Sequence, residues 1–528
     1  MFISAGAMAV TTSQSQSASH SHDTFSNTTF TNAVRLLFDV DGNQIDAYGA
    51  KINYFNGSYY LYGNSFSTSG VAFGIKSYSS PDLEHWKYEG FLFDPYEDNP
   101  CNGSGGCGRP HVICNDRASQ YVLWANAGSN GYQVATSLSP TGPFTFLNTT
   151  ASIDAQFNGL QPADFSVEVI DGAGYLVFSA LNFADPRAGS IWPPIFQTLH
   201  VSKLTDDFLN TTQTSFSVQS DAFDLVDQEA ESPDIFKRNG YFYIAASNTC
   251  GYCNGSIGLL YRSKSIEGPW ARQILSGYSC NGQVEGVIPL QHPGKEEDTY
   301  VWHSTSVPGG PRTGFSGHIF QPLSFDANGA ARNLDCNPNA SFSLHFVRGT
   351  QAIPVGAATQ AGDRSPLVAP YSAVCDSDQF DLFQTWKASR NGTLKSVSIN
   401  VARSVQTVPL SLTVFKFSSY ADLVVPQYKW NTLGTASYNA PQLSYVFETA
   451  VVNITTNATV IEGDLLGLAM TGQDFAPYCH LEYETAPGED RVLFQRGAGQ
   501  NSWRGSLKRT SPVYERVGTG IKFFATYA

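Results

Sequence analysis

The sequence is poor in charge and has no long apolar run. Charged residues make up only 14% of the 528-residue chain, and no apolar stretch reaches the roughly 18 residues that a membrane-spanning helix needs. Lys and Arg number 31 against 45 Asp and Glu, which gives a net charge of −14. This acidic surplus argues against a nucleic acid or an acidic membrane surface as partner. Long helical heptads are also missing, which disfavours an architecture of long helices.

Metal-binding cysteine patterns are scarce as well. Among nine Cys, Cys250-x-x-Cys253 has no second Cys-x-x-Cys or His pair that would complete a zinc set. A metal or redox pair at this position therefore stays an alternative, and disulfides are the favoured interpretation. Spacing does not fix the pairings, but Cys375 and Cys479 bracket the later part of the chain and could tie it together.

Glycine, proline and aromatic residues are abundant, and one short phrase built from them recurs. The chain has 47 Gly, 27 Pro and 13% aromatic residues, a composition typical of many short strands with tight turns. A turn followed by aromatic and β-branched residues occurs five times, at residues 57–63, 119–125, 173–179, 239–246 and 298–304. A period of this length built on strands indicates a radial array of small sheets. We therefore predict a five-bladed β-propeller; a generic β-sandwich is the alternative.

Four segments follow from this pattern. We expect a signal-like and disordered segment at residues 1–33, a five-bladed propeller that carries the catalytic site at 34–348, a linker at 349–370 and a β-sandwich of jelly-roll type at 371–528. The last prediction rests on the period-two alternation of residues 394–402 and 410–417. Aromatic residues that could bind carbohydrate there are Trp386, Tyr428, Trp430 and Trp503; packing in the core is the equal alternative.

Several features favour an extracellular protein. Residues 2–10 are apolar and end in a small-residue pattern that resembles a cleavage site. Disulfides form outside the cell. Ten Asn-x-Ser/Thr sequons begin at Asn27, Asn56, Asn102, Asn148, Asn210, Asn254, Asn339, Asn391, Asn453 and Asn457. We expect a secreted glycoprotein with disulfides and no membrane partner; the sequence does not indicate an oligomeric state.

Two carboxylates stand immediately before copies of the repeated phrase. Asp164 precedes the third copy and Glu231 the fourth, so both are expected on the innermost strand of a blade, facing the axis. Two acids brought together there suit glycosidic cleavage, because one must protonate the leaving oxygen and a second charge helps it to keep its proton. Glu229 shares strand parity with Glu231 and competes for the acid role. A solvated surface charge is the alternative for each.

These segments resemble glycoside hydrolase family 43. Residues 231–244, which read Glu-Ser-Pro-Asp-Ile-Phe-Lys-Arg-Asn-Gly-Tyr-Phe-Tyr-Ile, are similar to the general-acid segment of that family. Asp164 with the hairpin at 171–176 resembles its pKa-modulating Asp, and residues 79–86 resemble its first-blade signature. The opening at 41–52 looks most like the branch of exo-β-1,3-galactanases, with Tyr48 in place of the usual His. The resemblance spans roughly residues 35–345.

The resemblance implies roles for three residues. Glu231 would be the general acid and Asp164 the residue that modulates its pKa. Most of the family has an Asp base on the first inner strand, where this chain reads Tyr48-Gly-Ala-Lys; the galactanase branch lacks that base too, and Gln283 matches the Gln thought to position the water. Asp46 and Glu285 are the alternative carboxylates for this task.

The resemblance also points to pocket residues. Tyr48, Arg109, His303 and Arg312 are candidates for sugar binding, with structural packing as the alternative for His303 and Arg312. Gly108 replaces a Glu that reads sugar hydroxyls in the galactanase branch, so a loop acid, Glu97 or Asp98, could substitute, or the pocket accepts another sugar. No cofactor and no catalytic metal are expected, and a structural calcium ion is compatible with the family.

The sequence thus predicts an inverting, exo-acting glycoside hydrolase of β-galactosidic linkages in β-1,3-galactan or arabinogalactan of plant cell walls. In an inverting site the acid and the water-positioning group are about 6.5–9.5 Å apart. Activity as an α-L-arabinofuranosidase, β-xylosidase or galactofuranosidase is the alternative on the same fold. A non-catalytic carbohydrate-binding propeller, or an adhesion module dominated by the sandwich, is the alternative from another class.

Overall fold

The protein was analysed as a computed structural model. It describes residues 24–31, 37–40, 44–66, 72–95, 97–101, 107–182, 197–249, 255–290, 299–306, 317–336, 341–348, 362–366, 371–376, 380–403, 410–424, 429–438, 447–455, 458–471, 478–486, 489–497 and 513–528. The regular structure of these residues is almost entirely β, and their one α-helix is the four-residue α1 (Ala421–Val424). The chain is therefore all-β, as its composition predicts.

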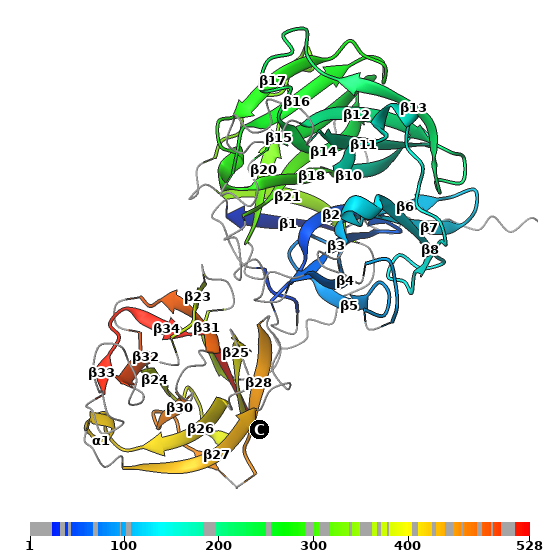
Figure 1. The fold of residues 1–528 in the computed structure, drawn as a ribbon. Helices are drawn as coiled ribbons and strands as arrows, with labels where there is room; N and C mark the ends of the chain where they lie inside the picture. The colour runs from blue at the N-terminus through cyan, green and yellow to red at the C-terminus, as the bar shows by residue number, and fades with distance from the viewer. Residues whose placement is uncertain are drawn as a thin grey trace, which may run out of the picture.

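Five antiparallel sheets follow one another along the first 323 residues (Figure 1). The first contains β2 (Tyr48–Phe55), β3 (Ser58–Phe66), β4 (Ala72–Ser80) and β5 (Lys87–Phe91). The second contains β6 (Gly108–Asn115), β7 (Gln120–Asn126), β8 (Tyr132–Ser137) and β9 (Thr145–Phe146). The third contains β10 (Gln161–Ile170), β11 (Ala173–Leu181), β12 (Gln197–Leu204) and β13 (Thr211–Val218). The fourth contains β14 (Ala230–Arg238), β15 (Tyr241–Asn248), β16 (Gly258–Ser263) and β17 (Ala271–Ser276), and the fifth β18 (Gln283–Leu290), β19 (Thr299–Ser306) and β20 (Gly317–Leu323).

The repeated phrase forms the second strand of every one of these sheets, namely β3, β7, β11, β15 and β19. Each pairs with the strand before it, so the first strands are β2, β6, β10, β14 and β18. These first strands contact one another in chain order, and β18 contacts β2. The five first strands therefore surround one common region, and polar side chains on them can meet there.

Large aromatic side chains fill the space between neighbouring sheets. Trp124 and Tyr132 of the second sheet belong to the same buried cluster as Phe165 and Phe178 of the third. The rings of Tyr132 and Phe165 lie 4.6 Å apart, within the range of favourable aromatic pairs. This packing explains the high aromatic content, because each sheet needs a bulky apolar face on both sides.

The strands β1 (Thr24–Thr31) and β21 (Ser341–Arg348) form a separate antiparallel pair that joins the two ends of this region. Short 3₁₀ turns occur at η1 (Gly128–Asn130), η2 (Ala155–Phe157) and η3 (Ser279–Asn281). The last of these lies directly before β18, where the backbone of Cys280 has a φ of 56°. This turn delivers the chain to the first strand of the fifth sheet.

Two further sheets gather the strands of the C-terminal part (Figure 1). One contains β22 (Gly362–Arg364), β23 (Ser372–Val374), β25 (Gly392–Arg403), β28 (Glu448–Asn453), β29 (Thr459–Val460), β31 (Tyr478–Glu484), β34 (Thr519–Ile521) and β35 (Phe523–Tyr527). The other contains β24 (Phe380–Lys387), β26 (Leu410–Phe417), β27 (Trp430–Tyr438), β30 (Leu465–Thr471), β32 (Val492–Gly497) and β33 (Tyr514–Glu515). Side chains from both sheets share one buried cluster.

Two of the four aromatic residues considered for carbohydrate binding pack inside this C-terminal part. Trp386 is 1% exposed and contacts the ring of Phe523. Trp430 stacks on Phe415 with ring centroids 4.5 Å apart. Tyr428 and Trp503 lie outside the described residues. Of the two interpretations given for Trp386 and Trp430, these contacts favour packing.

Three disulfides join described cysteines: Cys101–Cys107, Cys280–Cys336 and Cys375–Cys479. The third is the tie suggested by the sequence. Cys114 is a free thiol, and Cys250 and Cys253 lie outside the described residues.

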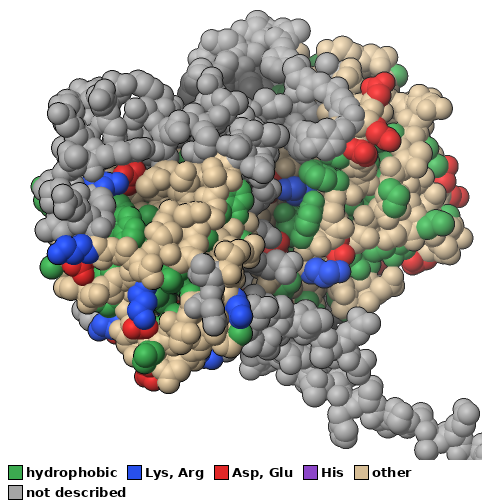
Figure 2. Space-filling model, turned by 90° about the horizontal axis from the view of Figure 1, so that it is seen from below, with side chains coloured by type: hydrophobic (Ala, Val, Ile, Leu, Met, Phe, Trp, Pro, Cys, Tyr) green, Lys and Arg blue, Asp and Glu red, His purple; other side chains and the backbone are tan. Residues whose placement is uncertain are grey.

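The surface agrees with the acidic composition. On the described part of the face in Figure 2, Lys and Arg side chains are few and scattered, with Asp and Glu side chains among them. A nucleic acid would require a concentrated basic patch. Within the described residues, no helix is long and apolar enough to cross a membrane.

Candidate active site between the first strands

Each first strand has an irregularity in its pairing near its start, and the candidate residues lie at or beside these irregularities. The pairing register shifts at Tyr48/Lys51 in β2, Gly108/His111 in β6, Pro162/Phe165 in β10, Glu231/Asp234 in β14 and Val284/Gly286 in β18. Such β-bulges re-aim side chains and are frequent next to active sites. All five first strands therefore have altered side-chain directions near their starts.

Proline and left-handed backbone explain why the sequence bulges at these points. Pro110 and Pro233 fall inside two of the irregularities and have no N–H to give to a strand ladder. Arg109 and Ser232, the residues just before them, have φ of 46° and 54°. Gly49 takes the equivalent place in β2 with φ of 63°, a value that glycine adopts at little cost.

Glu231 is held by two amide side chains. It is 8% exposed. Its Oε1 accepts a hydrogen bond of 2.9 Å from Nε2 of Gln283, and its Oε2 accepts one of 2.8 Å from Nε2 of Gln197. Oε1 of Gln283 in turn accepts a 3.3 Å bond from the hydroxyl of Tyr48. The structure thus brings Tyr48, Gln283 and Glu231 from three different sheets into one hydrogen-bonded chain.

The expected separation of acid and water-positioning group is wrong for this structure. Gln283 and Glu231 are in direct contact, whereas an inverting site needs about 6.5–9.5 Å between such groups. The physical reason is that both side chains are buried, and buried polar groups take a partner when one is within reach. A sugar and its water would have to part these two groups.

Asp164 lies beside this chain and is linked to it through Ser232. The hydroxyl of Ser232 donates a 2.6 Å hydrogen bond to Oδ2 of Asp164, and Ser232 directly follows Glu231. The Arg109 guanidinium is 3.9 Å from the same carboxylate oxygen. Asp164 is 29% exposed, in contrast to Arg109 at 7%. Asp164 is therefore the more accessible charge beside the buried Glu231.

Arg109 belongs to the second sheet, and its guanidinium donates hydrogen bonds to groups of the third and fifth sheets. Its Nη1 lies 3.0 Å from Oε2 of Glu285, and its Nε donates to the carbonyl of Phe165 at 3.4 Å. The neighbouring charges of Asp164 and Glu285 outweigh burial and raise the pKa of Arg109. The contacts of Arg109 therefore organise the site from within, and its role in binding sugar stays a prediction.

A buried ion pair lies among the same strands, and the sequence interpretation did not find it. Nζ of Lys51 is 2.5 Å from Oδ1 of Asp234 and 3.5 Å from Oε2 of Glu168. Lys51 is 3% and Asp234 0% exposed. Burial raises the pKa of Glu168, a change that the charge of Lys51 opposes. Lys51 follows the Tyr48-Gly-Ala motif, and its apolar surroundings in the sequence gave no sign of a partner.

This ion pair bears on the structural calcium that the resemblance allows. The ammonium of Lys51 already provides a cation between the carboxylates of Asp234 and Glu168. Among the described residues, no group of three or more His, Cys, Asp or Glu side chains could hold a metal ion. These two carboxylates therefore do not need a metal ion as a partner, and no step of the reaction is assigned to one.

Two buried histidines flank the site without reaching its polar chain. His303 is 1% exposed, bonds to His318 at 3.0 Å and stacks on Phe320. Burial lowers its pKa well below the usual value, and burial does the same for His111, helped in both by the charges of Lys51 and Arg109. Both imidazoles are thus neutral. A direct contact of His303 with sugar stays a prediction.

The remaining candidates are distributed differently. The carboxylate of Asp46, an alternative for the base, pairs with Lys76 at 3.1 Å and accepts a hydrogen bond from Ser65. Both partners lie outside the hydrogen-bonded chain of Tyr48, Gln283 and Glu231. Glu229 is half-buried, and burial raises the pKa of its carboxyl group. Arg312 lies outside the described residues.

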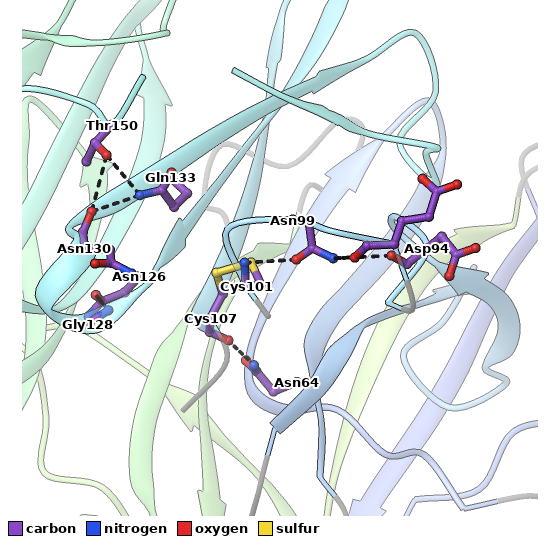
Figure 3. Close-up of a disulfide and its surroundings, with 11 residues drawn as sticks. Asn64, Asp94, Asn99, Cys101, Cys107, Asn126, Gly128, Asn130, Gln133 and Thr150 are labelled. Carbon is purple, nitrogen blue, oxygen red and sulfur yellow. Dashed lines mark hydrogen bonds between the residues drawn. A yellow bond between two sulfur atoms is a disulfide. The ribbon is translucent and has the colours of Figure 1, made fainter. Parts of the chain in front are cut away.

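The segment before Gly108 contains the proposed substitute acids, and Figure 3 shows Asn99 and the Cys101–Cys107 disulfide of this segment. The amide of Asn99 donates to the carbonyl of Glu97 at 2.8 Å, and its Oδ1 caps the N–H of Cys101. Glu97 and Asp98 are exposed and line an open pocket of about 610 Å³, which β9 and its flanking residues also line. Arg109 does not line that pocket. This pocket therefore does not bring Glu97 or Asp98 together with Arg109.

Glu285 gives the site a pH-dependent contribution to stability. Burial raises the pKa of this 1% exposed carboxyl to about 7, against the opposing effects of Arg109 and Thr305. The folded protein then binds a proton that the unfolded chain has lost, so stability falls as pH rises from about 4.5 to 7, by at most roughly 3 kcal/mol. We expect the melting temperature of wild type to fall more between pH 5 and pH 8 than that of Glu285→Gln. Equal falls in calorimetric scans would contradict the raised pKa.

Part of this chain is similar to a known family of proteins. Residues 46–276 match the model of glycosyl hydrolases family 43. A curated relative, the non-reducing end α-L-arabinofuranosidase BoGH43B of Bacteroides ovatus, is 28% identical over 225 residues, which cover 39% of this chain and 36% of that protein. The chain thus spans about a third of the length of that relative.

One solved structure with a similar fold and a second, more distant one illustrate the likeness. A candidate exo-β-1,3-galactanase from Bifidobacterium bifidum s17 is 21% identical with a TM-score of 0.50 and covers 58% of this chain and 96% of its own. An exo-β-1,3-galactanase from Clostridium thermocellum is 18% identical with a TM-score of 0.48 over 95% of this chain and 100% of its own. The matched residues contain Tyr48, Arg109, Asp164 and Glu231 and end seven residues before Gln283. Residues 46–276, less than half of the chain, are therefore similar to family 43 of the glycosyl hydrolases.

Proposed function

We propose that the protein is a secreted, exo-acting, inverting glycoside hydrolase that removes β-galactosyl residues from β-1,3-galactan or arabinogalactan of plant cell walls. The family supports a glycosidase. The disulfides among the described residues support an oxidising compartment and hence secretion. The likeness to the B. bifidum structure supports the fold on which this activity would operate.

The architecture we propose is a five-bladed propeller at residues 34–348, a linker at 349–370 and a β-sandwich at 371–528. The contacts of the five first strands in chain order, with β18 against β2, support the propeller. The buried cluster shared by the two C-terminal sheets supports the sandwich. A propeller collects residues from all its blades at one end of its axis, which is where a small polar ligand binds.

One observation carries the galactanase-type mechanism. The amide of Gln283 contacts Glu231, while the first strand β2 offers Tyr48 and then Lys51, with no carboxylate from Tyr48 to Phe55. An acid with a neutral amide beside it, and no Asp base on the first inner strand, is the pattern that the galactanase branch implies. We therefore assign the positioning of the water to Gln283.

The reaction can be written so that its protons balance. Glu231 gives its proton to the glycosidic oxygen as the bond to the anomeric carbon breaks, and the water oxygen bonds to that carbon from the opposite face. The water's proton passes to Oε1 of Gln283 while the sugar separates the two side chains. When the products leave, the contact between Nε2 of Gln283 and Oε1 of Glu231 forms again, and the protonated amide returns a proton from Nε2 to Glu231 through it. Gln283 is then imidic and regains its amide form by exchange of protons with water. The charge of Asp164 favours the protonated acid before the step.

Product analysis tests this function. With β-1,3-galacto-oligosaccharides, we expect galactose to be released one unit at a time from the non-reducing end, and proton NMR to show the α-anomer first, because the configuration inverts. Release of the β-anomer first would contradict inversion. Release of internal oligosaccharides would contradict exo action.

A second candidate activity is favoured by one relative. BoGH43B is named a non-reducing end α-L-arabinofuranosidase, and Gly108 leaves no carboxylate at a position where the galactanase branch reads sugar hydroxyls. Arabinose release from α-L-arabinofuranosides without galactose release would select this activity. Binding in calorimetry without any released monosaccharide would select a non-catalytic binding propeller.

A further inference from the structure

We propose that Gln197 is a positioning residue that holds the carboxyl group of Glu231 for proton transfer. This inference rests on the proposed function, in which Glu231 is the general acid. Gln197 belongs to neither the repeated phrase nor the motifs that resemble family 43. Gln197 is 2% exposed, so it would act on the reaction through Glu231 and not by touching the sugar.

The backbone fixes Gln197 next to Glu231. Gln197 is the first residue of β12 in the third sheet, yet its N–H donates to the carbonyl of Gln228 at 3.1 Å, just before the fourth sheet. It also forms an isolated parallel bridge with Glu229. These contacts attach the start of β12 to the segment that leads into β14. The backbone of Gln197 is therefore held beside Glu229, two residues before Glu231 in the chain.

The side chain of Gln197 completes a clamp on the carboxyl group. Its Nε2 lies 2.8 Å from Oε2 of Glu231 and 2.6 Å from Oγ1 of Thr249. Gln283 occupies the other oxygen of Glu231, Oε1. With an amide on each oxygen, the plane of the carboxyl group is fixed. When a sugar and its water displace Gln283, Gln197 is the contact that remains.

The amide of Gln197 suits both protonation states of the acid. Two N–H donors suit an ionised carboxylate, but a protonated acid must also find an acceptor or keep its O–H free for the substrate. Oε1 of Gln197 is buried and has no hydrogen-bond partner among the described residues. Turning the amide over would place this oxygen opposite Oε2 of Glu231, which can donate when it carries the proton; the hydroxyl of Thr249 already donates to the carbonyl of Glu229 at 3.0 Å. The two orientations of an amide exchange a donor for an acceptor at one place.

Gln197 therefore differs from a packing residue in a measurable way. It should matter most when the leaving oxygen needs a proton. A β-1,3-linked disaccharide leaves as a poor sugar alkoxide and requires general acid catalysis, which contributes about 10²- to 10⁴-fold. A dinitrophenyl β-galactoside leaves without a proton. A defect in positioning the acid must divide these two substrates, whereas a general loss of structure lowers both.

The experiment compares Gln197→Leu and Gln197→Glu with wild type on both substrates over pH 3–9. We expect Gln197→Leu to lower kcat on the disaccharide by about 10- to 100-fold, as for loss of a hydrogen bond to a charged group, with a change below about threefold on the aryl galactoside. We expect Gln197→Glu to move the alkaline limb of the kcat/KM profile to higher pH, because a second carboxylate disfavours loss of the acid's proton. Gln133→Leu is the matched control, since Gln133 is a 6% exposed amide on β8 that bonds to Asn130 and Thr150.

The outcomes separate this inference from the proposed function. Equal losses on both substrates in Gln197→Leu, or an alkaline limb unmoved in Gln197→Glu, would overturn the positioning role while galactose release by wild type and its loss in Glu231→Gln still uphold the function. Activity of Glu231→Gln equal to wild type on the disaccharide would instead overturn the function and, with it, the premise for Gln197.

Discussion

Replacing Glu231 by Gln is expected to lower kcat on a β-1,3-galacto-oligosaccharide by about 10³-fold or more, near the upper end of what a general acid contributes. The substitution keeps the size and the hydrogen-bonding capacity of the side chain but removes the transferable proton. Glu231 is 8% exposed and bonded to Gln197 and Gln283, and an amide can still bond to both. The melting temperature should therefore stay close to that of wild type.

The leaving group and a neighbouring acid provide the controls for Glu231. A dinitrophenyl β-galactoside should be hydrolysed by Glu231→Gln with a much smaller loss, because its leaving group needs no proton. Glu229→Gln tests the rival acid two residues earlier on the chain; Glu229 is half-buried, and its backbone carbonyl, which the substitution retains, bonds to Thr249. We expect this variant to keep near wild-type activity. The reverse result, with Glu229→Gln inactive and Glu231→Gln active, would transfer the acid role to Glu229.

Replacing Asp234 by Ala is expected to destabilise the N-terminal sheets by about 3–5 kcal/mol, the usual cost of removing one partner of a buried ion pair. Asp234 is fully buried, lies 2.5 Å from Nζ of Lys51 and accepts a 2.8 Å bond from the N–H of Val287. Lys51 is 3% exposed in the structure, and without Asp234 its ammonium would keep the carboxylate of Glu168, at 3.5 Å, as its ion-pair partner. In calorimetry, at about 2–4 °C per kcal/mol for a domain of 150–250 residues, the midpoint should fall by roughly 6 °C or more.

An exposed ion pair between the third and fourth sheets supplies the matched control. Asp171 pairs with Lys237, and their side chains are 71% and 31% exposed. Water screens such a pair, so Asp171→Asn, which suits the φ of 53° at this turn, should change stability by no more than about 1 kcal/mol. If Asp234→Ala and Asp171→Asn shift the melting midpoint equally, burial does not set the value of the Lys51–Asp234 pair. If the pH optimum of the hydrolytic activity is the same in both variants, the substitutions act on stability and not on the catalytic groups.

Some residues of the site could be predicted from the sequence, and others could not. The acids Asp164 and Glu231 could be found because each precedes a repeated strand, and the structure places them on β10 and β14, beside one another through Ser232. Gln283 could be found only through its likeness to a family. Lys51, Asp234 and Gln197 left no such signal, because the partner of each lies in another sheet.

The period of the repeated phrase was sufficient to predict strands, their hairpin partners and the all-β class, because turns and alternating apolar residues act locally along the chain. It could not determine how side chains from different sheets pair. The direct contact between Gln283 and Glu231, the pairing of Arg109 with Glu285, and the pairing of Lys51 with Asp234 and Glu168 all join residues of different sheets at or beside the β-bulges of the first strands. Distances between these residues depend on the packing of five sheets, a long-range property that only the tertiary structure decides.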